Sequence, residues 1–190
     1  MRAALERIDR DNSFDALSMR KLTREVGVVP TAFYRHFPDM DALGLALVDE
    51  SFRTMRELLK AARAAPLPDE QLIRRSVEIF VTHVRAQRQH FQFIARERFG
   101  GVRVIRDAIH TEIRLIISEL ATDLGRFPVL QNWTTEDLQM IASLIVGAMV
   151  NNVEELLAAD RRGREDEDII RRAEKQLRLV ILATPHWRSH

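Results

Sequence analysis

Apolar residues recur at helical spacing along most of the chain, and short polar or Pro- and Gly-containing segments interrupt them. No stretch of any length shows the alternation of a half-buried strand. The pattern therefore predicts an all-α fold. The predicted helices cover, approximately, residues 2–9, 19–26, 30–37, 39–64, 69–87, 90–98, 102–124, 135–159 and 166–183.

Four residues near the start of the chain are of types that favour the start or the end of a helix. Ser18 is suited to cap the helix that runs to about residue 26. Gly27 suits the position after that helix, where a left-handed backbone is needed. Pro30 suits the first turn of the next helix, and Asp39 suits the cap of the long helix that follows. The sequence thus predicts two short helices joined by a glycine turn.

The predicted helices group into two domains. Residues 1–38 hold short helices, and residues 39–190 hold a bundle of longer ones. The helix that starts at Asp39 joins them without a flexible linker, so movement in one domain is expected to reach the other.

The second short helix separates apolar from polar side chains. Phe33 and Phe37 are four residues apart and face the small core of the hairpin, which leaves Thr31, Tyr34 and Arg35 on the opposite side. This arrangement describes a helix-turn-helix, whose second helix enters the major groove of DNA. The alternative is an ordinary solvated helix face. The predicted DNA-contacting residues are Ser18, Arg20, Thr31, Ala32, Tyr34, Arg35 and His36.

The stretch "LSMRKLTREVGVVPTAFYRHFPDMDALGLALVDE" resembles the DNA-binding domain of the TetR family of bacterial regulators over residues 1 to about 50. The resemblance implies that an all-helical ligand-binding domain follows. It also implies a dimer formed by the last two helices, and a repressor that a small ligand releases from a palindromic operator.

A narrower resemblance concerns residues 33–52 and 91–124, which are similar to the FabR/DesT group. That group responds to long-chain acyl-CoA or acyl carrier protein and controls the synthesis of unsaturated fatty acids. Most TetR proteins carry a phosphate-contacting lysine where this chain has Met40, and the FabR/DesT group also lacks that lysine. The resemblance further places the start of the chain inside the first helix, without the usual basic arm.

Apolar residues of the second domain have two interpretations, a packed core or a tunnel for an acyl chain between helices. The helix segment from Met140 to Val150 is apolar nearly all round, which predicts burial on all sides, against a pocket and a partner subunit. The candidate effector-lining residues are Phe80, Phe91, Ile94, Ile113, Ile117, Leu144, Ile145, Ala148 and Met149.

Two arginines, Arg96 and Arg98, lie at a predicted helix end. They either complement the helix dipole or form a basic mouth for the phosphates of coenzyme A, with Arg74 or Arg75 helping. On the last helix, an apolar stripe beneath charged residues predicts a dimer seam. Its members are Ile169, Ile170, Ala173, Leu177 and Val180.

Composition narrows the function classes. The net charge is +1, so DNA binding must come from local charge. Cysteine is absent, which excludes disulfides and zinc–thiolate sites. No signal peptide opens the chain and no apolar run appears long enough for a bilayer, so a soluble cytoplasmic protein without a membrane partner is predicted. The sequence shows no hydrolytic, cofactor or metal motif, and His83, His90 and His110 are interpreted as surface or capping residues.

The favoured hypothesis is a homodimeric transcriptional repressor, not an enzyme, that binds operator DNA and responds to a long-chain acyl thioester. A second hypothesis replaces this effector with another hydrophobic molecule or a drug, with efflux or catabolic genes as targets. A third is a helical lipid-binding protein or enzyme without a DNA role.

Overall fold

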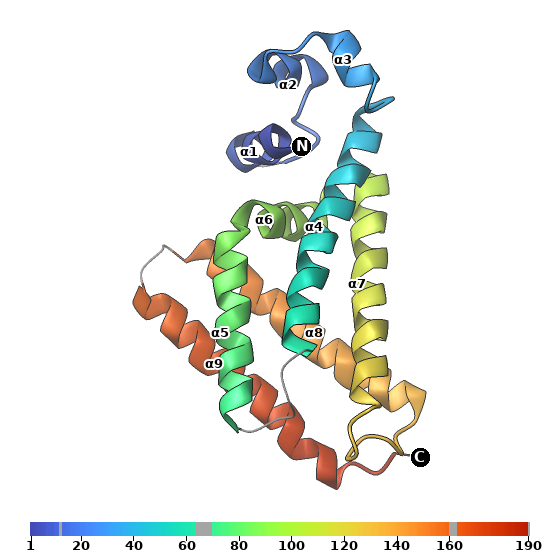
Figure 1. Ribbon diagram of the computed structural model, residues 1–190, viewed down its shortest axis with the longest axis vertical. Coiled ribbons are helices and arrows are strands. Elements are labelled where there is room, and N and C mark those ends of the chain that lie inside the picture. Colours follow the sequence, from blue (N-terminus) through green and yellow to red (C-terminus); the bar gives the residue numbers. More distant parts are fainter. Residues whose placement is uncertain (12, 64–69, 160–162, 190) are drawn as a thin grey trace. The chain divides into compact units, whose positions relative to one another are not determined.

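The computed structural model describes residues 1–11, 13–63, 70–159 and 163–189, and over these residues the regular structure is helical (Figure 1). The all-α prediction is confirmed. Of the segments predicted to interrupt the helices, residues 65–68 lie outside the described residues, as do the first three residues of the segment 160–166. The elements are α1 (Arg2–Asp11), α2 (Met19–Val26), α3 (Pro30–Tyr34), α4 (Met40–Arg63), α5 (Glu70–Ala86), α6 (Arg88–Glu97), α7 (Arg103–Leu124), α8 (Thr135–Ala158), α9 (Gly163–Ala183) and the 3₁₀ turn η1 (Thr184–His186).

The chain forms two compact units. The first comprises Met1–Leu59 and Gln87–Glu112, and the second comprises Lys60–Ala86 and Ile113–His190. The first unit therefore combines α1, α2, α3 and α6 with parts of α4 and α7. The predicted domain boundary at residue 38 stays a prediction, because the two units describe packing and not independent folding.

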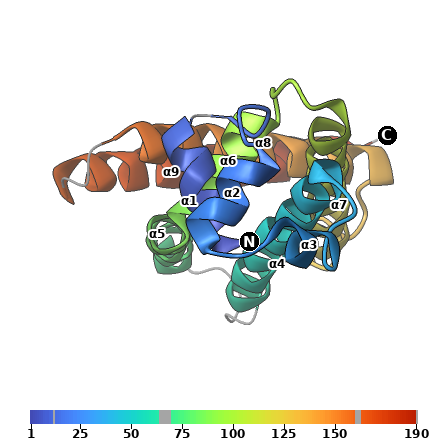
Figure 2. The same ribbon diagram turned by 90° about the horizontal axis from the view of Figure 1, so that it is seen from above.

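The core of the first unit is built where α1 packs on α6 (Figure 2). Phe14, between α1 and α2, is buried with its ring edge against Phe93 of α6, at a centroid distance of 6.5 Å. Gly44 of α4 allows a close approach here, because a Cβ atom would lie 2.3 Å from Cδ1 of Ile105. The absence of a side chain at residue 44 thus makes room for Phe14 and Ile105.

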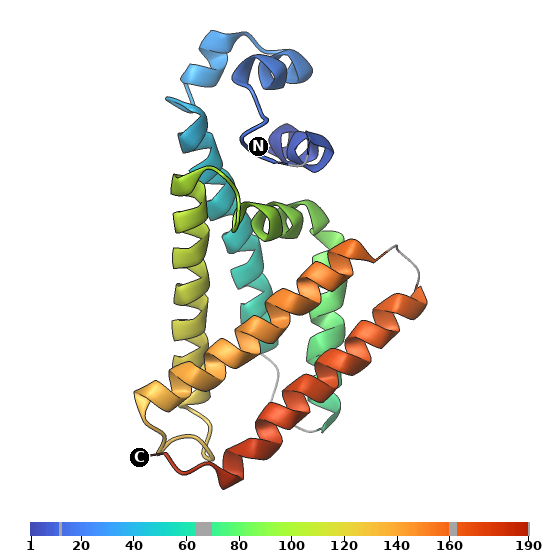
Figure 3. The ribbon, with the colours of Figure 1, turned by 180° about the vertical axis from the view of Figure 1, so that it is seen from behind.

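In the second unit, α9 packs on both α5 and α8, and Figure 3 shows α8 and α9 running side by side. Ile169, Ile170 and Ala173 are buried within this single chain. The prediction that these three residues form a dimer seam is therefore wrong. The apolar stripe of α9 is occupied within the protomer, because α5 and α8 need an apolar face to pack against.

Arg85 of α5 connects the ends of α8 and α9. Its Nη1 donates to the carbonyl oxygen of Leu156 at 2.6 Å, and its guanidinium also donates to the carboxylate of Asp166. The carbonyl belongs to the last turn of α8, and the carboxylate belongs to the first turn of α9. One half-buried cation therefore fixes the junction of these two helices.

Helix α8 differs from its prediction in its apolar length and in its burial. By length and composition it is apolar enough to cross a bilayer, yet only 28% of an 18-residue apolar stretch within it is buried inside the chain. The expectation that no apolar stretch reaches this length is wrong on these two measures. Leu144 is 58% exposed and Met140 is also exposed, so within one chain the helix is not buried on all sides. Met140 and Leu144, four residues apart, therefore form an exposed apolar face of α8.

Candidate nucleic-acid interface and effector residues

Local backbone chemistry defines the α2–α3 hairpin. Ser18 has an extended backbone, and its hydroxyl accepts from the N–H of Lys21 at 3.2 Å. Gly27 adopts the left-handed conformation, with φ of 72°. The N–H of Val28 then donates to the carbonyl of Thr23 at 2.9 Å, which closes the end of α2. The predicted cap and glycine turn are both confirmed.

Helix α3 starts at Pro30, as predicted, but ends at Tyr34, three residues before the predicted end. The chain continues in a turn, in which the N–H groups of His36 and Phe37 both donate to the carbonyl of Phe33, at 2.9 and 3.0 Å. Pro38 disfavours a helical conformation at Phe37, so the chain cannot remain helical beyond this turn. Asp39 then caps α4 by accepting from the N–H of Ala42 at 2.7 Å.

The two faces of α3 differ in chemistry. Phe33 is buried, with the ring of Phe37 at 5.6 Å and the ring of Tyr34 edge-on at 5.7 Å. Thr31, Tyr34 and Arg35 are exposed. The outward projection that a recognition helix requires is therefore present.

The remaining predicted DNA residues lie around this face. Ser18, Arg20 and His36 are exposed, and Ala32 is half-buried. Arg20 lies in the first turn of α2, which contains no acidic residue. A cation and the partial positive charge of a helix N-terminus thus occur together, which suits contact with a phosphate.

Two valines in the turn, Val28 and Val29, are exposed and are not among the residues predicted to contact DNA. Val29 is 64% exposed and occupies the N-cap position of α3, without a side-chain hydrogen bond to the helix. Serine, threonine, asparagine or aspartate would satisfy a backbone N–H there and stabilise the helix by about 1 kcal/mol. An apolar residue at a cap position beside an exposed polar face is the sequence signal that was overlooked.

Four of the candidate effector residues belong to the first unit. Phe91 and Ile94 are buried, in keeping with a packed core. The Nη1 of Arg96 donates to the carbonyl of Ile8 in α1 at 3.2 Å. The guanidinium of Arg98 lies 4.4 Å from the ring centre of Phe99.

The other candidate effector residues belong to the second unit. Phe80 is buried and Leu144 is exposed. The rest are half-buried, and each therefore leaves part of an apolar side chain accessible. These half-buried residues are Ile113, Ile117, Ile145, Ala148 and Met149.

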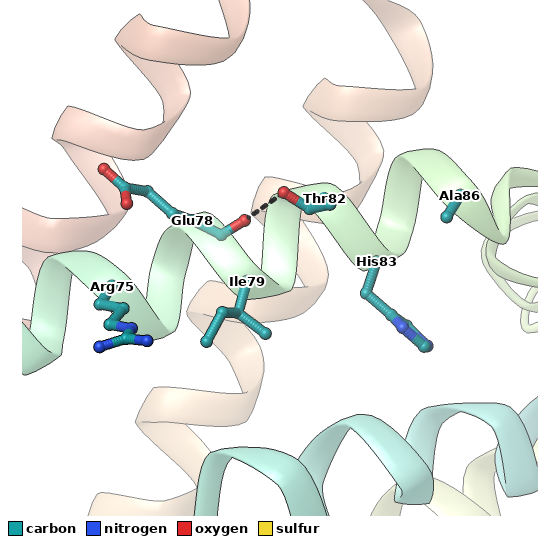
Figure 4. Close-up of a pocket in the computed structure, with 6 residues that line it drawn as sticks. All are labelled: Arg75, Glu78, Ile79, Thr82, His83 and Ala86. Carbon is teal, nitrogen blue, oxygen red and sulfur yellow. Dashed lines mark hydrogen bonds between the residues drawn. The ribbon is translucent and has the colours of Figure 1, made fainter. Parts of the chain in front are cut away.

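One hollow of about 430 Å³ lies along α5 (Figure 4). Its lining combines Ile79 and Ala86 with Thr82, His83, Glu78 and Arg75. The neighbouring Arg74 is differently placed, because its guanidinium forms ion pairs with Glu78, Glu167 and Glu174.

The carboxylates beside Arg74 also affect its titration. Hydrogen bonding to Glu167 raises the pKa of Arg74, and Glu78 acts in the same direction. Of the two arginines predicted to assist in anion binding, Arg75 is thus the one that faces the hollow.

The three histidines have different surroundings. Nε2 of His110 lies 2.9 Å from the carbonyl oxygen of Arg98, just after the end of α6, which fits the predicted capping role. Nδ1 of His90 lies 3.0 Å from the hydroxyl of Ser51, and burial lowers the pKa of His90. His83 lines the hollow along α5.

Comparison with known proteins agrees with this architecture. Residues 3–47 match the family described as bacterial regulatory proteins, tetR family. Residues 68–184 match the tetracyclin repressor-like C-terminal domain. A solved structure of a TetR-like transcriptional regulator from Rhodococcus sp. RHA1 superimposes with a TM-score of 0.68, over 93% of this chain and 92% of the other, at 18% identity. At that identity the structural likeness concerns the fold.

Proposed function

We propose an effector class and a mode of action for this chain, which belongs to the TetR family and is a transcriptional regulator. The proposal is a dimeric repressor whose affinity for a palindromic operator changes when a long-chain acyl thioester binds. Its gene targets would be those of fatty acid metabolism. One observation carries the DNA-binding part: Thr31 and Tyr34 of α3, and Arg35 directly after it, are exposed, while Phe33 of the same helix is buried.

Each exposed side chain has a role in the proposed operator complex. Arg35 contacts guanine or a phosphate, while Thr31 and Val29 contact base edges or thymine methyl groups. Tyr34, His36, Arg20 and Ser18 hold the phosphate backbone. Because the hairpin is compact and locally capped, it presents these groups in a fixed geometry.

Dimerisation is proposed through the free faces of α8 and α9. On α9, Leu179 and Leu182 are each 68% exposed, and on α8 Met140 and Leu144 are exposed. Apolar patches of this kind mark interaction sites in proteins. A twofold axis through this surface would give each dimer two α3 helices, as a palindromic operator requires.

The effector part rests on the half-buried apolar residues of α7 and α8. They offer accessible apolar surface to a hydrocarbon chain, and each CH₂ group buried there would contribute roughly 0.8 kcal/mol. The hollow along α5, of about 430 Å³, supplies Arg75 and His83 for an anionic head group. That size lies within the range of roughly 300–1,000 Å³ common for small-molecule sites.

The deciding experiment measures operator binding in the presence of saturated and unsaturated acyl-CoAs of increasing chain length. The operator is first isolated by selection from random duplexes with the unmodified chain. A change in affinity that grows with chain length supports the proposal. If no acyl-CoA in the series alters the affinity for the operator, the proposed effector class is wrong.

A second effector class is favoured by one contact. The guanidinium of Arg96, predicted for the mouth of a coenzyme A site, donates to the carbonyl of Ile8. That hydrogen bond fits an uncharged hydrophobic effector or drug, for which no phosphate site is needed. Mass spectrometry of small molecules that co-purify with the chain separates the two: a thioester supports the first class, and an uncharged compound supports the second.

A further inference from the structure

A buried carboxylate joins the segment between α1 and α2 to helix α6. Glu97, the last residue of α6, is only 2% exposed. Its Oε1 accepts from the backbone N–H of Phe14 at 2.7 Å. Phe14 lies in the segment between α1 and α2, so the bond spans 83 positions of sequence within one compact unit.

The position of Glu97 is sterically defined. A Cβ atom at Gly100 would lie 2.3 Å from Oε2 of Glu97, so any larger residue there would displace the carboxylate. Gly101 is different, because its Cβ would lie 3.4 Å from Oδ2 of Asp15, an ordinary contact. Nη1 of Arg106 also donates to the carbonyl of Gly100 at 2.9 Å, which holds this turn in place.

A second hydrogen bond runs parallel to the first. Arg96, the neighbour of Glu97, donates to the carbonyl of Ile8 in α1. The end of α6 is therefore bonded to α1 and to the segment entering α2. The ring of Phe14 packs against Phe93, which adds an apolar contact to the same α6 surface.

Burying the charged carboxylate of Glu97 lowers the stability of the fold. Burial raises the pKa of Glu97, the Phe14 N–H and Arg96 oppose that change, and Asp15 adds to it. Glutamine would accept the same hydrogen bond without the cost of burying a charge. The property of Glu97 that matters for the segment entering α2 is therefore its hydrogen-bond acceptor, which glutamine would retain.

We propose that Glu97 is a positioning residue for DNA recognition, which holds the segment entering α2 against the end of α6. The proposal rests on operator binding as described under Proposed function. It concerns a residue that contacts neither DNA nor effector.

The main test compares Glu97→Ala with Glu97→Gln. Operator affinity is measured well below the melting temperature, and exchange of the Phe14 amide hydrogen is followed by NMR. Loss of the acceptor in Glu97→Ala should accelerate Phe14 exchange and weaken operator binding, each about tenfold. Glu97→Gln keeps the acceptor and should bind operator within about twofold of the unmodified chain. A purely structural role would instead lower affinity only in proportion to the unfolded fraction.

The glycine pair supplies an independent route that leaves Glu97 in place. Gly100→Ala should displace the carboxylate and reproduce the loss of operator affinity, while Gly101→Ala should not. In the double variant with Glu97→Ala, Gly100→Ala should add less than twofold, because its clash with the carboxylate is gone. Gly100→Ala also carries the test if Glu97→Ala does not fold.

Two results would overturn the proposal. One is unaltered operator affinity in both Glu97→Ala and Gly100→Ala, despite accelerated Phe14 exchange. The other is an affinity loss in Gly101→Ala equal to that in Gly100→Ala. If the unmodified chain selects no operator, the proposed function fails together with this proposal. If the unmodified chain selects an operator, and the Glu97→Ala and Gly100→Ala variants bind that operator with unchanged affinity, only the positioning role fails.

Discussion

The exposed faces of α3 and α8 have opposite chemistry. On α3 the outward residues are Thr31, Tyr34 and Arg35, all able to form hydrogen bonds. On α8 the outward residues include Met140 and Leu144, and α9 adds Leu182. A polar, partly cationic face suits binding to a hydrated polyanion such as DNA. An apolar face binds favourably only when another apolar surface removes it from water. One chain with a net charge of only +1 thus presents two exposed faces of different chemistry.

The largest expected effect is on the apolar face. Leu182→Asp would place a carboxylate in the proposed seam, and symmetry places it twice. At about 2 kcal/mol for each copy of a central interface residue, the dimer should weaken about 1,000-fold. Sedimentation equilibrium measures this, and operator affinity should fall with it.

Val129→Asp is the matched control for Leu182→Asp, because Val129 is also exposed but lies in the connection between α7 and α8. It should leave the dimer intact. Equal dissociation constants for the Leu182→Asp and Val129→Asp dimers would show that the dimer contact lies elsewhere than at Leu182.

A second prediction concerns the support of the apolar face. Arg85→Ala removes the cation that joins Leu156 and Asp166, and should lower the free energy of unfolding by about 2 to 3 kcal/mol. For a chain of this length the melting temperature should fall by about 5 to 10 °C. Arg85→Lys retains the charge but not the forked donor geometry, so calorimetry should place it between the two. A melting temperature unchanged in Arg85→Ala would show that α5 does not brace the junction.

The third prediction tests the polar face. Arg35→Ala should weaken operator binding by about 1 to 3 kcal/mol and, if Arg35 contacts a phosphate, reduce the salt dependence by about one counterion. Fluorescence anisotropy over a range of salt concentrations measures both quantities. Arg53→Ala is the control, since Arg53 is exposed on α4 and paired with Asp49. Equal losses in both variants would indicate a nonspecific charge effect.

A fourth prediction asks whether the polar face also has an apolar element. If Val29 contacts a thymine methyl group, replacing that thymine with deoxyuridine should weaken binding about fourfold, equivalent to roughly 0.8 kcal/mol. Val29→Ala should bind both duplexes with equal affinity. A Val29→Ala variant that still distinguishes thymine from deoxyuridine would assign the methyl contact to another residue.

The smallest effect belongs to neither surface. Burial lowers the pKa of His90 below its ordinary value of 6.5, so the unfolded chain binds this proton more readily than the folded chain, and the fold loses stability as the pH falls from 6.5 toward the lowered pKa. The groups that face the ring are Ser51 and Glu50. His90→Gln should lose less stability on acidification than the unmodified chain in urea titrations at several pH values. Parallel curves would exclude this contribution.

Local chemistry explains why the hairpin was predictable. Ser18, Gly27, Pro30 and Asp39 each fix the backbone near themselves, and the structure places all four at the predicted boundaries. The end of α3 was less predictable, since it depends on a turn in which the N–H groups of His36 and Phe37 both donate to the carbonyl of Phe33.

Long-range polar contacts could not be predicted from pattern. Glu97 bonds to a residue 83 positions away, and Arg85 bonds to one 71 positions away. No periodicity encodes such distances. Ile169, Ile170 and Ala173 were assigned to a dimer seam for a related reason: a helical stripe shows that a face is buried, but not whether its partner belongs to the same chain.

The close packing at Gly44 has an evolutionary consequence. Because Cδ1 of Ile105 occupies the space that a Cβ at residue 44 would need, the two positions share one fixed volume. Relatives that retain this packing should exchange bulk between them, a larger residue on α4 accompanying a smaller one on α7. Neither position can drift alone, so α4 and α7 should carry correlated substitutions at this crossing.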